Sequence, residues 1–227
     1  MDNGLGDLPP ARASTLVQQV LTELRQRIVD GRLAPGTVVP DSVIAKQMGI
    51  SRAPVRDACN LLVQSGMLTK KQNYPYRVRD FSVADLGELQ LIRWGYESAA
   101  ARQLVRSGEL PAGTEEILLR MAEAARLGDG RLSAAADMDF HRALVRASGL
   151  PQLILRYESL ADQLGILIRE IPDFVLSTQV HRHQEILDLL RVSQQAADAR
   201  PVLAVLETHL LTRREDVERS AVLGGSA

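Results

Sequence analysis

Three histidines and one aspartate in the C-terminal part of the chain have the side chains and the spacing of metal ligands. Asp137 precedes His141 by four residues, so the two side chains share a face if this segment is a helix. His183 and His209 fall on two later predicted helices. Three imidazoles and a carboxylate that converge inside a helical bundle suit a borderline divalent ion such as Zn²⁺, Ni²⁺ or Mn²⁺.

The same histidines have a second interpretation as ordinary core residues. A single histidine on an apolar helix face is commonly a hydrogen-bonded part of the core. Spacing alone does not distinguish this from a metal site. Asp139, two residues before His141, points to another side of the helix and is not expected to join such a site.

A basic segment in the N-terminal part of the chain predicts contact with a polyanion. Between Lys46 and Arg79 there are seven Lys or Arg residues and a single acid, Asp57, a local charge of +6 in a protein whose formal net charge is −1. Such a concentration of positive charge is typical of a nucleic-acid-binding surface. Charge alone is equally consistent with a solvated face of a small helical domain.

The distribution of charge along the chain favours two domains. Residues 1–80 have eleven basic and seven acidic side chains, whereas residues 81–227 have sixteen and twenty-one. The first balance is +4 and the second is −5. We therefore expect a disordered leader over residues 1–13, a domain over 14–80 that is the candidate for nucleic-acid binding, and a second domain over 81–222 with a different role.

Composition favours a mainly α, cytoplasmic protein. Leu, Ala and Val abound while there are only three Phe, one Trp and four Tyr, which suits helix-on-helix packing. The single cysteine, Cys59, permits no internal disulfide and fits a reducing compartment. No apolar run reaches the ~18–20 residues that span a bilayer, and the N-terminus lacks signal-peptide features. We expect no membrane partner.

Apolar periodicity predicts the elements that position the basic segment. Gly49 separates two short helices, for which Asp41 and Ser51 are possible capping residues. Two short strands follow, joined by a turn at residues 72–75. This order of elements is a winged helix-turn-helix with a small β-hairpin wing. The expected elements are a helix over 15–29, helices beginning at Asp41 and Ser51, and strands over 67–71 and 76–80.

From residue 83 onward the sequence shows only helical patterns. Ser82 and Asp85 open the first of these helices, and Gly149 ends the third. The expected architecture is an all-α six-helix bundle. Its helices are expected over residues 83–106, 111–128, 132–148, 151–170, 176–192 and 199–220.

The start of the second helix of a helix-turn-helix enters the major groove of DNA. Arg52 and Arg56 are expected to read bases, because a guanidinium donates two hydrogen bonds to guanine and contributes ~1–3 kcal/mol of discrimination. Basic hairpin residues, including Arg79, are expected to contact phosphates. The residues expected at the DNA are Ser51, Arg52, Ala53, Pro54 and Arg56 on the helix, and Lys70, Lys71, Gln72, Asn73 and Arg77 on the hairpin.

The segment GRLAPGTVVPDSVIAKQMGISRAPVRDACNLLVQSGML resembles the DNA-binding domain of GntR-type transcription regulators. Their pattern joins G-x-L-x-P-G to a G-[VI]-S-R-x-P-V-R-[ED]-A run and to L-x-x-x-G-[LM]. The resemblance covers about residues 14–80. Ser42 stands where some members have a DNA-contacting arginine. The wing tip lacks the common glycine, but Asn73 can adopt the left-handed conformation, so we expect the hairpin to form.

The segments DMDFHRALVRASG, HQEILDLL and ETHL resemble the signature segments of the FadR-type (FCD) effector domain, and with RWGYESAAARQL the resemblance covers about residues 83–215. Members often bind a metal through one aspartate and three histidines. The ligands that the resemblance implies here are Asp137, His141, His183 and His209. His181 matches no signature position and is expected to be exposed. A count of six helices instead of seven implies the VanR-like variant.

One departure from the family pattern bears on His209. The stretch between Leu190 and Asp198 is about four residues longer than usual, which is close to one helical turn. The side chain of His209 is therefore expected to stay on the same side of its helix, while its depth in the bundle could shift.

The resemblance also implies a small organic acid as effector. A carboxylate inside a bundle needs a cationic partner, and Arg93 on the first helix of the domain is the candidate. Arg93 can equally pair with Glu97 at i+4 as an ordinary helix ion pair. The sequence leaves both interpretations open.

These expectations together describe a ligand-responsive transcription regulator, a repressor, that binds a palindromic operator as a homodimer and has no catalytic residues. Dimerisation is expected because two recognition helices must reach half-sites about one turn apart. One alternative is a metal-dependent hydrolase with an accessory DNA-binding domain, which would need a general base beside the metal. The other alternative is a DNA binder with a purely structural metal.

Overall fold

The computed structural model describes residues 14–169 and 179–211. The chain divides between Asp80 and Phe81 into two compact units. The expected leader over 1–13, the expected helix start at 176, the continuation of the last helix beyond residue 211 and the domain end at 222 all lie outside the described residues. None of the helices in the described ranges is long and apolar enough to cross a membrane.

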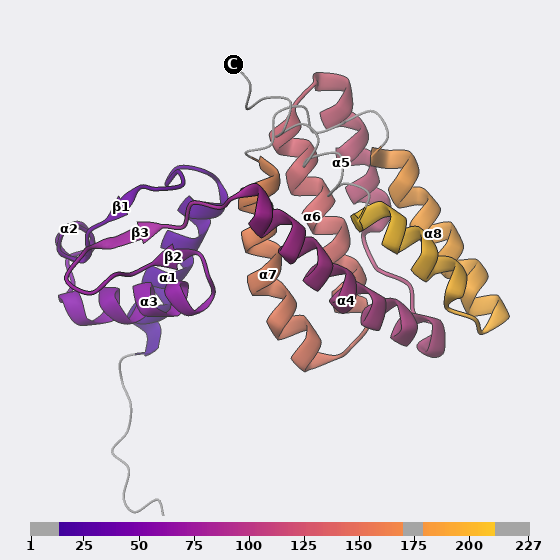
Figure 1. The fold of residues 1–227 in the computed structure, drawn as a ribbon, viewed down its shortest axis with the longest axis horizontal. Helices are drawn as coiled ribbons and strands as arrows, with labels where there is room; N and C mark the ends of the chain where they lie inside the picture. The colour runs from indigo at the N-terminus through magenta and orange to yellow at the C-terminus, as the bar shows by residue number, and fades with distance from the viewer. Residues whose placement is uncertain (1–13, 170–178, 212–227) are drawn as a thin grey trace, which may run out of the picture. The chain divides into compact units, whose positions relative to one another are not determined.

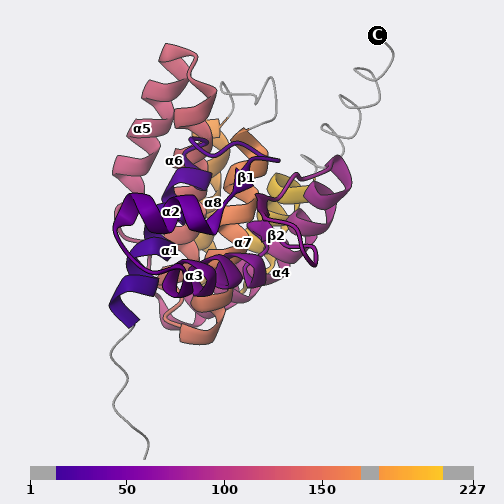
Figure 2. The same ribbon diagram turned by 90° about the vertical axis from the view of Figure 1, so that its left-hand side faces the viewer.

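The first unit is a winged helix-turn-helix, as the sequence predicts. Its strands form one antiparallel sheet in the order β1-β3-β2, seen beside the three helices in Figures 1 and 2. Gly49, at φ 65°, takes the left-handed conformation that turns the chain from the first short helix into the second. The elements are α1 (Ser14–Val29), β1 (Val38–Val39), α2 (Asp41–Met48), α3 (Arg52–Gln64), β2 (Leu68–Thr69) and β3 (Tyr76–Val78).

Helix α3 packs against α1 through one apolar face and leaves its opposite face exposed. Cys59 lies on the packed face and is fully buried, as expected for a small core residue. The buried positions recur every three or four residues in both helices, so burial follows helical periodicity. They are Val20, Leu24 and Ile28 on α1, and Val55, Ala58, Cys59 and Leu62 on α3.

The wing differs from the sequence expectation in one strand and one cap. Strand β1 was not predicted, because two residues are too short to show alternation, and it forms only by pairing Val38 with Arg77 of β3. Asp41 does not cap α2, since Pro40 occupies that position and Asp41 is the first helical residue. Asn73 has a φ of 63°, which confirms the expected left-handed turn at the wing tip.

The second unit is all-α, and its described residues contain the six helices that the sequence predicts. Helix α4 contacts α6, α7 and α8, so one of its faces is buried against the other helices (Figure 1). The helices are α4 (Val83–Ser107), α5 (Thr114–Leu127), α6 (Gly130–Ala147), α7 (Pro151–Arg169), α8 (Gln179–Ala196) and a last helix over residues 200–211.

Local capping explains where the central helices begin. Ser82 and Asp85 form a capping box at the start of α4, as expected, with Asp85 N to Ser82 Oγ at 3.2 Å. The carboxylate of Asp129 accepts hydrogen bonds from the backbone of Arg131 and Leu132, both at 3.0 Å. This cap lets α6 begin at Gly130, two residues before the predicted start at Leu132.

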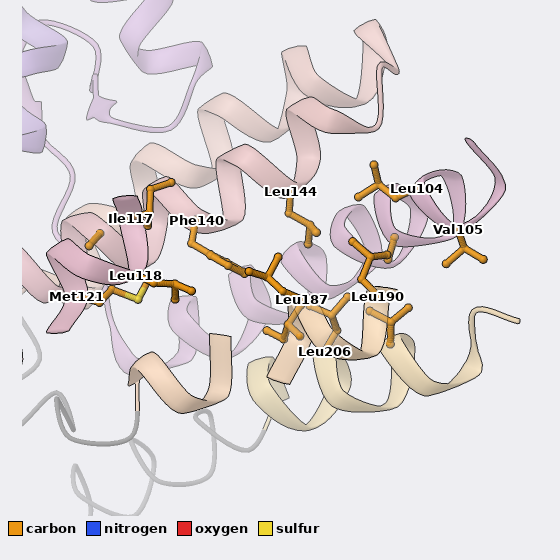
Figure 3. Close-up of a cluster of buried hydrophobic side chains, with 14 residues drawn as sticks. Leu104, Val105, Ile117, Leu118, Met121, Phe140, Leu144, Leu187, Leu190 and Leu206 are labelled. Atoms are coloured by element: carbon orange, nitrogen blue, oxygen red, sulfur yellow. The ribbon is translucent and has the colours of Figure 1, made fainter. Parts of the chain in front are cut away.

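Two apolar clusters fill the bundle, and both involve α4 and α6. The cluster in Figure 3 joins α4, α5, α6, α8 and the last helix, and Phe140 extends from α6 toward Leu187 of α8. The other cluster packs α4 and α6 against α7 around Tyr157 and Leu164. The facing sides of α4 and α6 therefore lie between two apolar regions, where polar groups have little access to water.

The Asp129 cap gives a stability prediction. Asp129→Ala should lower the free energy of unfolding by about 1 kcal/mol, because two backbone N–H groups lose their acceptor. For a chain of this length, that corresponds to a fall of roughly 2–4 °C in the melting temperature. Asp129→Asn is the matched control and should keep the wild-type value. Equal melting temperatures for Asp129→Ala and wild type would contradict the assigned cap.

Candidate metal centre and nucleic-acid interface

Three helices bring four buried ligand groups to one point of the bundle. Asp137 and His141 share one face of α6, and both are fully buried. His183 of α8 and His209 of the last helix reach the same point, with exposed fractions of 0% and 3%. One ligand atom from each residue lies within 4.8 Å of those from the other three. We call these four residues the Asp–His cluster.

The spacing within the Asp–His cluster fits a single metal ion. Nε2 of His141 lies 3.1 Å from Nε2 of His209 and 3.2 Å from Nε2 of His183. Nε2 of His183 lies 3.2 Å from Oδ1 of Asp137. Two ligand atoms that are each ~2.1 Å from an ion and ~90–110° apart lie ~3.0–3.4 Å from one another. These three distances fall in that range, while Nε2 of His141 lies 3.9 Å from Oδ1 of Asp137, so the four groups would close up slightly around an ion.

The protonation of His141 also fits a metal ligand. Its Nδ1 lies 2.7 Å from Oε2 of Glu97. A carboxylate only accepts hydrogen bonds, so the ring proton is on Nδ1. In the neutral ring Nε2 then presents a lone pair toward the imidazoles of His183 and His209. A cation at this point would bind to that lone pair.

Glu97 is the shared acceptor of a buried hydrogen-bond network. Its Oε1 accepts from Nε of Arg93 at 2.7 Å and from the hydroxyl of Tyr157 at 2.6 Å. Although burial favours the neutral acid, the hydrogen-bonded His141 and the guanidinium of Arg93 lower the pKa of Glu97 to about 2. Glu97 is therefore ionised, and it links α4, α6 and α7 through charge-assisted hydrogen bonds.

Arg93 pairs with Glu97, and this pairing does not use all of its donors. Its Nε bonds Glu97, and its Nη2 lies 3.5 Å from Oδ2 of Asp137. Its Nη1 is buried and has no hydrogen-bond partner among the described residues. The ordinary i+4 ion pair is thus present, yet one donor of the fully buried guanidinium makes no hydrogen bond to the described residues.

Two further buried polar atoms lie one helical turn away. Arg93 meets Asp137 and Glu97 meets His141, both with an offset of 44 residues. Gln90 of α4 and Ser133 of α6 each stand about one turn before these pairs on their own helices. Oε1 of Gln90 and Oγ of Ser133 are buried without a hydrogen-bond partner in the part of the chain that the structure describes. Buried groups of this kind cost about 1–3 kcal/mol unless a polar ligand or water satisfies them.

Two pockets differ in their relation to the cluster. A small pocket of about 100 Å³ between α8 and the last helix is lined by His209, together with Arg182, Glu185, Val205 and Thr208. A larger cavity of about 520 Å³ is lined by residues of α5, of α6 and of the segment between α4 and α5, none of them from the cluster. Its arginines are already paired, for example Arg120 with Asp139 at 2.9 Å. Of these two pockets along the described residues, the small one reaches the cluster, through His209.

The sequence-predicted DNA contacts lie on an accessible surface of the first unit. The first turn of α3 exposes Arg52 and Arg56, and Ser51 stands at its N-cap position. The hairpin exposes Lys71 and Asn73. All ten predicted residues are exposed except Pro54, which is half-buried. These positions leave backbone N–H groups of α3 and the flanking arginines able to meet a phosphate or a base edge.

Three of the predicted basic contacts have partners within the wing or the neighbouring helix. Nη2 of Arg52 lies 3.0 Å from a carboxylate oxygen of Asp41, which holds the guanidinium beside the start of α3. The ammonium of Lys70 donates to the carbonyl of Tyr74 and lies 4.5 Å from the centre of the Tyr76 ring. Arg77 donates to the carbonyl of Gly36.

Sequence reasoning missed three residues of these sites. It treated Glu97 only as a partner of Arg93 and Asp41 only as a helix cap, and it did not single out Tyr157. The signal for Glu97 was its position on one face of α4 with Gln90 and Arg93, which is a polar row on a buried helix. Asp139 pairs with Arg120 away from the cluster, as expected. His181 is exposed, also as expected.

Comparisons with known proteins match a known domain to each of the two units. Residues 16–78 match the family described as bacterial regulatory proteins, gntR family, and residues 89–210 match the FCD domain. The chain is 32% identical over 182 residues to the probable D-xylose utilization operon transcriptional repressor of Paenarthrobacter nicotinovorans, which covers 78% of this chain and 79% of that protein.

A second relative and a solved structure extend this likeness. The gluconate operon transcriptional repressor of Bacillus licheniformis is 27% identical, over 66% of this chain and 62% of its own length. A GntR transcriptional regulator from Rhodococcus sp. RHA1 aligns with a TM-score of 0.74 at 23% identity. The alignment covers 90% of this chain and 98% of that one, which shows that the fold is shared.

The environment of His141 predicts a pH dependence of the metal-free protein. Burial lowers the pKa of His141, Arg93 lowers it further, and the carboxylates only partly oppose this, so it falls from 6.5 to about 4. Below pH 6.5 the unfolded chain binds a proton that the folded chain does not. Stability should therefore be constant above pH 6.5 and should fall by on the order of 3 kcal/mol as the pH drops toward 4.

Urea unfolding in chelator at several pH values checks this prediction. His141→Asn should flatten the decline between pH 6.5 and 4.5, whereas His181→Asn, at an exposed position, should leave it unchanged. A decline of equal size in wild type and His141→Asn would show that another group causes it.

Proposed function

Because the chain belongs to the GntR family of bacterial transcription regulators and has an FCD domain, we propose that it is a ligand-responsive repressor that binds a palindromic operator as a homodimer. The chain is a transcription regulator and not an enzyme, like the relatives it matches. Two of those relatives are named as operon repressors, which supports repression as the mode of regulation.

The proposed DNA contacts divide into base readers and phosphate contacts. Arg52 and Arg56 stand at the start of α3, the end that enters a major groove. Lys70, Lys71 and Arg77, with Gln72 and Asn73 at the wing tip, hold the DNA backbone. Asp41 keeps the guanidinium of Arg52 in place through the ion pair at 3.0 Å, which reduces the freedom that the side chain must lose on binding.

We assign the first unit, residues 14–80, to DNA binding and residues 81–222 to effector binding and dimerisation. Two copies are required because a palindromic site presents two half-sites related by a two-fold axis. Regulation of transcription places the protein in the cytoplasm. An effector acts only if it binds one arrangement of the two DNA-binding domains better than another.

The Asp–His cluster is the proposed metal centre, and the facing Nε2 atoms are the observation that supports it best. Asp137, His141, His183 and His209 would hold a divalent ion such as Zn²⁺, Ni²⁺ or Mn²⁺. Such an ion supplies a Lewis-acidic centre with remaining positions for an oxygen ligand. All four ligand side chains are buried, and His209 also lines the small pocket.

A small organic acid is the proposed effector. Arg93, Glu97 and Asp137 together have one formal negative charge, so a divalent ion leaves one positive charge in the buried site. A carboxylate would balance this charge and could accept from the unused Nη1 of Arg93. Gln90 and Ser133 would bind polar groups of the same molecule. One relative is named for gluconate, the anion of a sugar acid.

The DNA assignment predicts different effects for the two kinds of basic residue. Arg52→Ala combined with Arg56→Ala should weaken binding to an operator selected from random DNA by roughly 30-fold or more, because two base contacts of ~1–3 kcal/mol are lost. Lys71→Ala should weaken binding to all sequences equally and reduce the salt slope by about 1. Both are measured by fluorescence anisotropy over a salt series.

Retention of operator preference in the double variant would contradict the assignment of α3 as the reading helix. The melting temperature serves as the folding control. It should change little in either variant, because the substituted side chains are exposed.

The metal assignment is tested by elemental analysis of protein purified without chelator. About one divalent ion per chain is expected from four ligands at one site. His183→Ala should remove the ion, and His181→Ala should retain it, because that side chain two residues away is exposed. Wild-type protein that is metal-free and refuses added Zn²⁺, Ni²⁺ and Mn²⁺ would overturn the metal centre.

The effector assignment is tested by thermal shift with a panel of small carboxylic acids that includes gluconate. An effector should raise the melting temperature of metal-loaded protein and not of chelator-treated protein, because the charge balance differs. An unchanged melting temperature with every acid, in metal-loaded protein, would instead favour a structural metal.

A further inference from the structure

We propose that Glu97 is a positioning residue that holds His141 in the tautomer with its proton on Nδ1, so that Nε2 is available to the metal. The inference rests on the proposed metal centre for its functional meaning. The tautomer itself is a property of the protein without metal. Glu97 touches no ligand position of the cluster and acts only through His141.

Hydrogen bonds from two other side chains fix the orientation of the Glu97 carboxylate. Oε1 accepts from Arg93 Nε at 2.7 Å and from the Tyr157 hydroxyl at 2.6 Å. Oε2 is left to His141 Nδ1 at 2.7 Å. All four side chains are at most 1% exposed, so water does not compete for these positions. An ionised carboxylate has no proton to donate, and His141 must therefore be the donor.

The same arrangement predicts the effect of Glu97→Gln on the tautomer of His141. An amide has one acceptor oxygen and one NH₂ group. The two donors Arg93 and Tyr157 would hold the amide oxygen at the position of Oε1. The NH₂ group would then face Nδ1 of His141 and donate to it. This reverses the tautomer and places the proton on Nε2, which points into the Asp–His cluster.

A proton on Nε2 would block the atom that binds the metal. Nε2 of His141 lies only 3.1 Å and 3.2 Å from the Nε2 atoms of His209 and His183. To bind an ion, the ring would have to exchange this proton and break the new hydrogen bond to the amide. Loss of an outer-shell partner of a metal-bound histidine typically weakens metal binding by about 10–100-fold.

The first measurement needs no variant. Long-range ¹H–¹⁵N NMR spectra of metal-free wild type, labelled on histidine, report which ring nitrogen of His141 has the proton, and His141→Gln assigns the signals. We expect protonated Nδ1 and unprotonated Nε2. The opposite pattern, or a rapidly exchanging mixture of both tautomers, would overturn the proposal.

The second measurement compares metal affinity in two variants by competition with a chelator, using Zn²⁺ as the probe. Glu97→Gln should weaken binding by about 10–100-fold and show protonated Nε2 in the NMR spectrum. Tyr157→Phe is the matched control, because it removes one donor to Glu97 while leaving an acceptor for His141. It should change affinity by less than about threefold. Wild-type affinity in Glu97→Gln would contradict a positioning role.

The two measurements separate this inference from the metal assignment. If wild type binds no Zn²⁺ but shows the Nδ1 proton, the metal centre fails and the role of Glu97 in setting the tautomer stands. If wild type binds Zn²⁺ and His141 lacks the Nδ1 proton, the metal centre stands and the role of Glu97 fails.

Discussion

The fully buried ionic contact of Arg93 with Glu97 is the constraint on which the helical unit depends. Two charges removed from water are stable only if each is paired and hydrogen-bonded. Here the carboxylate of Glu97 accepts hydrogen bonds from Arg93 on its own helix, from His141 on α6 and from Tyr157 on α7, at 2.6–2.7 Å. These bonds set the rotation of three helices about their axes. The direction of Asp137 and His141, the proposed metal ligands on α6, follows from that rotation.

The apolar clusters on both sides make this network rigid. Phe140 belongs to the cluster with α5, α8 and the last helix, and its ring lies 4.6 Å from that of His183. Tyr157 belongs to the cluster with α7 and donates to Glu97. Each cluster contributes one aromatic side chain beside the polar residues of α4 and α6, Phe140 in one and Tyr157 in the other. These rings shield the polar residues from water. In such surroundings an unpaired group is costly and a complementary ligand is bound strongly.

The two units differ in where their functional charges lie, exposed in the first and buried in the second. In the winged helix-turn-helix, basic side chains stay exposed, and contacts such as Asp41 with Arg52 restrain them without neutralising the surface. In the helical unit, charge is concentrated where it cannot be solvated, so it must be balanced locally. Exposed charge gives long-range attraction to DNA. Buried charge gives selectivity for a ligand of opposite charge.

The sequence by itself determined the helices, the wing, the left-handed Asn73 and the four cluster residues, because helical periodicity, turn residues and family motifs are all read along a short stretch of chain. It did not determine the short strand β1, the cap at Asp129, the ion pair of Asp41 with Arg52, or the part played by Glu97. Arg93 had two interpretations: its pairing with Glu97 is present in the structure, and its contact with an effector stays a proposal. Only the tertiary structure decided the part played by Glu97, because the partners of Glu97 and His141 lie 44, 60 and 68 residues away in the chain. A hydrogen bond over such a separation depends on how whole helices pack, and no local pattern records it.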